Sequence, residues 1–250
     1  MTVDLGLLSD LAPDERRQVV ALMRRHSYAA GEVVFHEGDA ADSVHFVVEG
    51  RVVARRSSEQ GDRVAYAVMG PGQAFGELAM VVRDGRRTAT IECVERTVTL
   101  SLPFADFERL CARQPDVSRL LVRLLAERVN RLTESLMQAL HTPAELRVIR
   151  SLVLLCGLYS QGARRGSPVA VALNQTEIAE LAGVTRPTAN RVLRRLEDDG
   201  VVALDRGRLT VLDAAALHRA SAVPAPRLVP HYGLGRGTRS DPSGGARRRP

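Results

Sequence analysis

Apolar and polar positions change their spacing along the chain, and each change marks a different kind of element. Between residues 27 and 102, brief apolar runs alternate with glycines, which is typical of short strands joined by tight turns. This pattern predicts strands at residues 33–35, 44–48, 52–55, 64–68, 88–91 and 98–102. Strands of this kind indicate an antiparallel barrel or jelly roll. Residues 1–25, which precede it, fit short helices.

A helical period returns after Pro103 and continues into one long element. Residues 104–113 fit one helix and residues 116–140 a longer one. Along the longer helix, apolar residues recur at steps of four and three, at Leu121, Leu125, Val129, Leu132, Leu136 and Ala139. This repeat of about 3.5 residues is that of a coiled-coil seam. A lone helix could lay the stripe on the barrel instead, but its charged flanks favour a partner helix, so we expect a homodimer.

A second helical region begins where Thr142 and Pro143 end the long helix, because proline disfavours helical geometry in the residue before it. Residues 145–159 fit a helix and residues 169–173 an edge strand. Residues 174–196 then fit two short helices joined by a tight turn. Gly183 suits the end of the first helix, while Thr185 as N-cap and Pro187 in the first turn suit the start of the second.

The second of these short helices has two unlike faces. Its apolar stripe is Ala189, Val192, Leu193 and Leu196. Its other face carries polar and basic side chains that we expect to lack acidic partners within the helix, namely Arg186, Thr188, Asn190, Arg191 and Arg194. Strands at 201–204 and 209–212 follow, around a glycine turn with two arginines. Any helical hairpin can have a solvated charged face, but this arrangement with a wing is more typical of a module that reads DNA.

Composition qualifies this interpretation. The formal net charge is +6, but residues 222–250 carry six arginines against one aspartate, so the rest of the chain is nearly neutral. The argument for DNA therefore depends on the local arginines of the second helix and the wing. Cys93, Cys111 and Cys156 form no C-x-x-C pair, so neither zinc nor an iron–sulfur cluster is indicated. Without a signal peptide or a long apolar span, we expect a cytoplasmic protein that contacts no membrane.

The densest candidate site lies in the predicted barrel, at residues 75–79 and 86–90. Gly76 and Glu77 fit a tight turn that opens a short helical segment, whose free N–H groups can hold a phosphate. Arg87 offers a planar fork of donors and Thr88 a hydroxyl, while Glu77 can accept from a sugar hydroxyl. Together they describe a pocket for a phosphorylated sugar. A salt bridge between Glu77 and an arginine fits the spacing equally well.

On these motifs, residues 5–220 resemble the cyclic-AMP receptor protein/fumarate-nitrate regulator (Crp/Fnr) family of bacterial transcription factors. The resemblance implies an α+β fold with a cyclic-nucleotide-binding jelly roll over residues 1–115, a dimerisation helix over 116–141 and a winged helix-turn-helix over 142–220. Residues 221–250 are rich in Pro, Gly, Arg and Ser, so we expect a disordered basic tail.

The resemblance also implies roles for individual residues. Glu77 would take the ribose 2′-hydroxyl, and Arg87 with Thr88 the cyclic phosphate. Two polar residues reach the adenine in the cyclic-AMP sensors of this family. Leu132 and Thr133 stand at those positions here, and only Thr133 can hydrogen-bond a base. The expected ligand contacts are Gly76, Glu77, Leu78, Arg87, Thr88 and Thr133.

In the reading helix, Arg186, Thr188 and Arg191 match the family pattern. Pro187 stands where the best-known member has a base-contacting glutamate, so the operator should differ at that base pair. We expect Arg186 and Arg191 to bind guanine, and Gln175 and Thr188 to bind the DNA backbone. The expected DNA contacts are Gln175, Thr185, Arg186, Pro187, Thr188, Asn190, Arg191 and Arg194.

The resulting hypothesis is a homodimeric, effector-gated transcriptional regulator that binds double-stranded DNA and RNA polymerase. Cyclic AMP is the expected effector, and no cofactor is required. Because Leu132 cannot hydrogen-bond a base, a second hypothesis is a regulator that binds DNA without a nucleotide. A third is a nucleotide-binding subunit that acts on a protein partner. We expect no enzyme, because the chain has no G-x-x-x-x-G-K-[ST], H-E-x-x-H, G-x-S-x-G or G-x-G-x-x-G motif.

Overall fold

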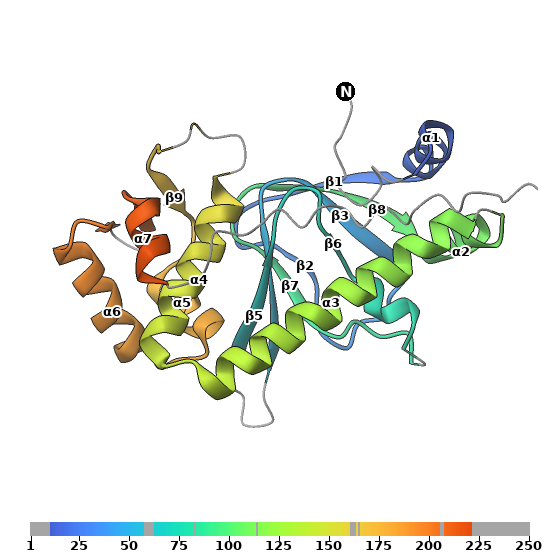
Figure 1. Cartoon of the computed structure of the whole chain (residues 1–250). Helices are drawn as coiled ribbons and strands as arrows, with labels where there is room; N and C mark the ends of the chain where they lie inside the picture. Colours follow the sequence, from blue (N-terminus) through green and yellow to red (C-terminus); the bar gives the residue numbers. More distant parts are fainter. Residues whose placement is uncertain are drawn as a thin grey trace, which may run out of the picture.

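A computed structural model of the chain describes residues 11–57, 63–82, 84–113, 115–160, 164, 166–205 and 208–221 (Figure 1). The basic tail from residue 222 onward, and Arg206 and Gly207 at the tip of the expected wing, lie outside the described residues. Helix α1 (Pro13–Ala21) leads into an N-terminal jelly roll, and a mostly helical C-terminal domain ends the described chain. None of the described helices combines the length and the apolar character needed to cross a membrane.

Two antiparallel sheets form the jelly roll. Strands β1 (Arg24–Tyr28), β8 (Thr97–Pro103), β3 (Ser43–Glu49) and β6 (Ala74–Phe75) pair in that order in the first sheet. The second sheet has the order β2 (Val33–Phe35), β7 (Thr90–Cys93), β4 (Val52–Ser57) and β5 (Arg63–Met69). Side chains that alternate inward from both sheets fill the space between them, including the buried Val47, Phe75 and Ile91. The predicted antiparallel jelly roll is confirmed.

The sequence pattern did not predict β1 or β6. Strand β1 reads Arg-Arg-His-Ser-Tyr and is exposed or only half-buried along its length, so it carries no apolar run. It forms through its ladder with β8, in which Arg24 pairs with Ser101 and Tyr28 with Thr97. Strand β6 has only two residues, which pair with His45 and Phe46. Neither strand is long enough or apolar enough to be recognised without its partner.

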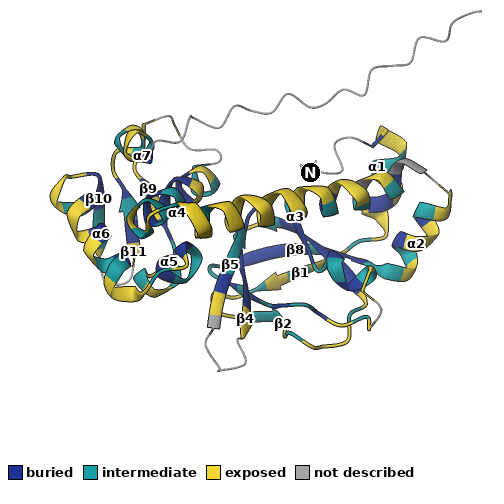
Figure 2. Ribbon diagram, turned by 60° about the horizontal axis from the view of Figure 1, so that its bottom comes forward, coloured by how far each residue is buried: buried dark blue, intermediate teal, exposed yellow. Residues whose placement is uncertain are grey.

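Helix α2 (Phe104–Arg113) leads into the long helix α3 (Pro115–His141), which runs along the flank of the jelly roll (Figure 1). One side of α3 packs on the roll through Val117 and Leu124. Another side is exposed, with Val129, Leu132 and Leu136 at 60%, 54% and 58% exposure (Figure 2). Leu121 of the expected seam instead packs partly against the roll, because its position on the helix matches that of Leu124 and Val117.

The C-terminal domain contains α4 (Ala144–Tyr159), β9 (Val169–Val171), α5 (Gln175–Ala182), α6 (Arg186–Asp198), β10 (Val202–Asp205), β11 (Arg208–Val211) and α7 (Ala214–Ala220). Strands β9, β10 and β11 form one sheet in the order β10-β11-β9. A single core joins these elements, and Leu152, Ile178, Leu193 and Leu209 are buried in it. The predicted winged helix-turn-helix is therefore confirmed. The sequence pattern did not predict α7.

Local signals set the helix-turn-helix. Asn174 caps α5, since its side-chain oxygen accepts from the N–H groups of Thr176 and Glu177. Gly183 ends α5 in the left-handed conformation at φ 61°, as its position predicted. Thr185 occupies the N-cap position of α6, but its hydroxyl lies 3.0 Å from that of Thr188 and does not cap the backbone.

Candidate functional site

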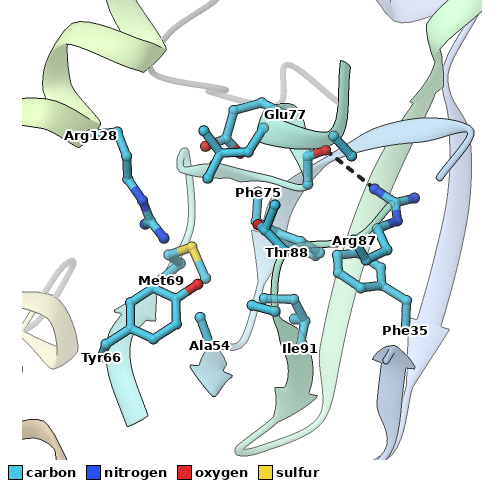
Figure 3. A pocket seen from close by; sticks show the side chains of 14 residues that line it. Phe35, Ala54, Tyr66, Met69, Phe75, Glu77, Arg87, Thr88, Ile91 and Arg128 are labelled. Atoms are coloured by element: carbon cyan, nitrogen blue, oxygen red, sulfur yellow. Dashed lines mark hydrogen bonds between the residues drawn. The ribbon is translucent and has the colours of Figure 1, made fainter. Parts of the chain in front are cut away.

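The candidate pocket lies between the short 3-10 helix η2 (Glu77–Met80), strands β4, β5 and β7, and helix α3 (Figure 3). Gly76 opens η2 at φ 84°, a conformation that favours glycine, and a Cβ there would lie 2.6 Å from Nη1 of Arg87. The structure thus brings Gly76, Glu77, Leu78, Arg87 and Thr88 together at one pocket. Phe35, Tyr66 and Arg128 also line it.

Arg87 is buried and hydrogen-bonded to the protein itself. Its Nη1 donates to the carbonyl oxygens of Ser43 at 2.7 Å and of Gly76 at 3.3 Å. Its guanidinium carbon lies 4.0 Å from the centre of the Phe35 ring, and Figure 3 shows the two side chains next to each other. Burial lowers the pKa of Arg87, and Asp42 and Asp39 oppose that shift. Its Nε is buried and has no hydrogen-bond partner among the described residues, so this donor is available to a ligand.

Glu77 is buried at the start of η2. Burial raises the pKa of its carboxyl group, whereas its own backbone N–H, Arg128 and Arg131 favour the charged form and lower the pKa. Arg128 comes from α3, and its guanidinium carbon lies 5.1 Å from the centre of the Tyr66 ring. Two cations of the long helix therefore favour the charged form of Glu77.

Tyr66 and Arg128 are pocket residues that the sequence argument missed. Arg128 precedes Leu132 by one helical turn on α3, so the helical period could have placed it near the expected base site. Tyr66 had no such signal, because it occupies an irregularity of the β4–β5 ladder: Ala54 pairs with Ala67 and Arg55 with Ala65, which leaves Tyr66 as an extra residue.

The pocket is narrow in this conformation. Its interior measures about 20 Å³, which is room for about one water molecule. It adjoins a wider hollow of about 530 Å³, and Tyr66, Leu78, Thr88 and Arg128 line both. A nucleotide would therefore extend into that hollow, and a group larger than a water molecule would enter the narrow part only if the side chains around it moved.

The two α3 positions matched to the family's base contacts differ in their place: Leu132 lines the wider hollow beside Tyr66 and Thr88, whereas Thr133 lines neither hollow. Thr133 is exposed on α3, and its hydroxyl donates to the carbonyl oxygen of Val129 at 3.0 Å. Leu132 lines a wider groove between the jelly roll and the C-terminal domain, together with Leu154, Leu158 and Leu181. Within one protomer, the structure does not bring Thr133 to Glu77 and Arg87.

A second candidate surface lies on α6 and the wing. Arg186, Pro187, Arg191, Arg194 and Thr185 are exposed there, whereas Gln175, Thr188 and Asn190 are half-buried. A hollow runs between the start of α5, α6 and the wing, and Gln175, Arg186 and Arg208 line it. The expectation that Arg194 lacks an acidic partner within the helix is wrong, because its Nη1 lies 2.7 Å from Glu197 Oε2, one turn further along.

Within the described part of the chain, the cysteines and acidic residues do not assemble into a metal site. Across the described residues, no group of three or more His, Cys, Asp or Glu side chains is placed to hold an ion. Cys93 and Cys156 are buried, and burial raises the pKa of the Cys93 thiol to about 11. A thiol with so high a pKa is a poor nucleophile and a poor metal ligand near neutral pH.

Known proteins share both parts of this architecture. Residues 25–114 match the family of cyclic nucleotide-binding domains, and residues 146–220 match the Crp-like helix-turn-helix domain. The chain is 33% identical to the cyclic AMP receptor protein of Thermus thermophilus over 84% of this chain and 94% of that protein.

Two further proteins resemble this chain over most of their length. The global nitrogen regulator of a Synechocystis species is 28% identical, over 76% of this chain and 85% of that protein. The solved structure of FixK2 from Bradyrhizobium japonicum superposes with a TM-score of 0.68 at 20% identity, over 81% and 99% of the two chains, which shows a shared fold. With these domains in this order, the chain belongs to the Crp/Fnr family of transcriptional regulators.

Proposed function

We propose that this regulator is a homodimer gated by a cyclic nucleotide, with cyclic AMP as its effector, and that it acts on DNA in the cytoplasm together with RNA polymerase. The pocket carries the proposal. Gly76, Glu77, Arg87 and Thr88 lie at one site and offer a donor fork, a hydroxyl and a carboxylate. A phosphate fits the donors and a ribose hydroxyl fits the carboxylate, and a cyclic nucleotide contains both groups.

The exposed stripe of α3 supports the dimer. Val129, Leu132 and Leu136 follow the spacing of a coiled-coil seam and are each more than half exposed in the single chain. Burying them against the same stripe of a second copy removes apolar surface from water. Thr133 follows Leu132 at the edge of this stripe, so we expect it to reach the base in the partner's pocket.

The exposed basic face of α6 supports DNA binding. A two-fold dimer of helix-turn-helix domains presents its two reading helices about 34 Å apart, one turn of B-DNA. Arg186 and Arg191 are exposed at the start and middle of α6, where a bidentate contact with guanine is possible. The match of residues 146–220 to a Crp-like helix-turn-helix also argues against a subunit that acts only on a protein partner.

The first prediction concerns Arg87. We expect Arg87→Ala to abolish cyclic AMP binding, because the variant loses the planar fork for the phosphate, while the fold is retained. Calorimetric titration of the dimer with cyclic AMP and cyclic GMP measures this. Arg86→Ala is the matched control: Arg86 is exposed and donates to the carbonyl oxygen of Gly38, so its loss should leave affinity unchanged. Equal cyclic AMP affinity in Arg87→Ala and the wild type would contradict the assignment.

A regulator that binds DNA without any nucleotide is the second candidate. Two observations favour it: Leu132 replaces a polar base contact, and the pocket interior has room for about one water molecule. In that case neither nucleotide would bind, and the affinity for an operator would be the same with and without cyclic AMP.

A further inference from the structure

We propose that two arginines of the jelly roll form an interdomain clamp, which holds the C-terminal domain against the roll. The nucleotide pocket lies on the opposite face of the same sheet, and the clamp opens when that pocket widens. The clamp consists of Arg51 and Arg55 and their partners Glu92, Glu95, Leu158, Tyr159, Glu177 and Glu180. Its role in gating rests on the proposed function.

Arg55 is the centre of the clamp. It projects from β4 and is buried, with 6% of its surface exposed. Its Nη2 lies 2.6 Å from Glu177 Oε1 and its Nη1 lies 2.5 Å from Glu180 Oε2, and both glutamates belong to α5. Its Nε lies 3.2 Å from Glu92 Oε2 on β7. One guanidinium thus links the sheet to the first helix of the helix-turn-helix.

This arrangement requires the arginine. Glu177 and Glu180 lie one turn apart on the same face of α5, and Glu92 faces them from the sheet. Three carboxylates around a largely buried position repel one another when the cation between them is removed. Loss of Arg55 should therefore separate α5 from the sheet as well as weaken the contact.

Arg51 holds a second point, at the end of α4. Its Nη2 donates to the carbonyl oxygen of Leu158 at 2.8 Å, at the negative end of the helix dipole. Its guanidinium carbon lies 3.8 Å from the centre of the Tyr159 ring, and its Nη1 lies 2.6 Å from Glu95 Oε1 in the roll. Close packing accompanies these contacts, because a Cβ on Gly70 would lie 2.8 Å from a methyl carbon of Leu158.

The clamp and the pocket occupy opposite faces of one sheet. Ala54 and Ile91 line the pocket, whereas Arg55 and Glu92, the next residues on β4 and β7, carry the clamp. Ala54 and Ile91 are direct partners across the β4–β7 ladder. A ligand that widens the narrow part of the pocket on this side would therefore press on the strand segments that position Arg55.

Tyr66 strengthens the connection. It is the extra residue opposite Ala54 and Arg55 in the β4–β5 ladder, and its ring lines the pocket beside Arg128. The ladder is interrupted there, and a bulge of this kind bends the strand and increases its twist locally. A ligand that moved Tyr66 would therefore act on the bulge that supports Arg55. Before the ligand binds, the closed clamp would keep α5 and α6 against the roll.

The test compares two neighbouring arginines. Arg55→Met removes the clamp charge and keeps an apolar stem. Arg56→Met is the matched control. The side chain of Arg56 is 63% exposed, and its Nε lies 3.0 Å from Oε1 of Glu37, which also belongs to the jelly roll. Glu180→Gln weakens the clamp from the other side. Glu177 is left unchanged, since its Oε2 also accepts from the N–H of Asn174 and caps α5.

Hydrogen exchange of the full-length dimer, read at β4, β5 and α5, measures the clamp itself. Arg55→Met and Glu180→Gln should speed exchange there, whereas Arg56→Met should match the wild type. Affinity for a selected operator, measured without nucleotide, tests the gating. We expect it to rise by roughly 5–150-fold in Arg55→Met, with a correspondingly smaller further gain on adding cyclic AMP.

Each outcome is decisive. Exchange in Arg55→Met and Glu180→Gln equal to that in Arg56→Met would overturn the clamp. Faster exchange with weaker operator binding would overturn the inhibitory role, because the clamp would then hold the DNA-binding orientation. Failure of the wild type to bind cyclic AMP would remove the proposed effector, but the exchange and nucleotide-free operator measurements would still decide whether the clamp restrains the domain.

Discussion

At the scale of single residues, the jelly roll keeps several polar side chains buried by giving each a partner. His45 on β3 is the clearest case. Its ring stacks on Phe75 with centres 5.2 Å apart, and its nitrogens lie 3.3 Å from the hydroxyls of Ser43 and Thr99. Burial lowers the pKa of His45 to about 3, and the nearby Arg87 and His26 act in the same direction. His45 is therefore neutral in the folded protein at any ordinary pH.

This predicts a pH dependence of stability. Below the ordinary histidine pKa of about 6.5, His45 takes up a proton in the unfolded chain but not in the folded one, so stability falls as pH decreases from about 6.5 towards 3. Between about pH 7 and pH 5, the wild type should lose roughly 2 kcal/mol more than His45→Gln. Urea unfolding at each pH measures the difference. His36→Gln changes an exposed histidine, so its stability should fall with pH as that of the wild type does. If His45→Gln lost as much stability as the wild type, the explanation would be refuted.

At the scale of elements, helix α3 contributes side chains both to the pocket and to the exposed apolar stripe. Its inner side packs on the jelly roll and supplies Arg128 to the pocket, while the stripe through Val129 and Leu136 faces outward (Figure 2). Because residues on a helix advance by about 100° each, the pocket face and the stripe are only a fraction of a turn apart. The proposed dimer contact and the pocket therefore lie close together on this helix.

Leu136→Glu should convert the dimer to a monomer, since a carboxylate on the seam must be buried without a partner when two copies associate. Light scattering at micromolar protein measures the mass. Asn130→Glu is the control, because it adds the same charge to α3 about a third of a turn from Val129 and off the stripe. A Leu136→Glu protein that still has the mass of a dimer would place the interface elsewhere.

Elements with a strong period were predictable, and those without one were not. Helix α2 begins and ends at the predicted residues, and the other helices of the expected set differ by only a few residues. Strand β1 was missed because Arg24, Arg25 and His26 give no apolar signal and depend on β8. In the pocket, residues 76–88 could be recognised as a local motif. Tyr66 and Arg128 could not, because they reach it from separate elements through the tertiary fold.

At the scale of the whole molecule, both charged and apolar contacts hold the C-terminal domain against the jelly roll. Each domain has its own buried core, Val68 and Val94 of the roll pack against the C-terminal core, and Arg51 and Arg55 bridge the two domains. Separate cores allow each domain to stay folded while the angle between them changes. The proposed dimer then carries two reading helices whose separation depends on that angle.

The spacing of the operator tests this arrangement. A two-fold operator with half-sites about one helical turn apart should bind tightly, because both α6 helices enter the major groove on one side of the duplex. Inserting half a turn of DNA between the half-sites places them on opposite sides, so affinity should fall by roughly 100-fold or more. Fluorescence anisotropy at fixed salt measures this, with a substitution of the central base pairs at constant length as control. Equal affinity for both spacings would indicate that each protomer binds alone.

The two oxygens of Glu177 have separate tasks, with a consequence for how fast the regulator can respond. Oε1 lies 2.6 Å from Arg55, while Oε2 accepts from Asn174 at 2.8 Å. When Arg55 separates from Glu177 in the proposed opening of the clamp, the other oxygen keeps the first turn of α5 in place, so the helix-turn-helix domain moves away already folded. The response then needs no refolding step, and we expect it on the microsecond-to-millisecond timescale of hinge motions.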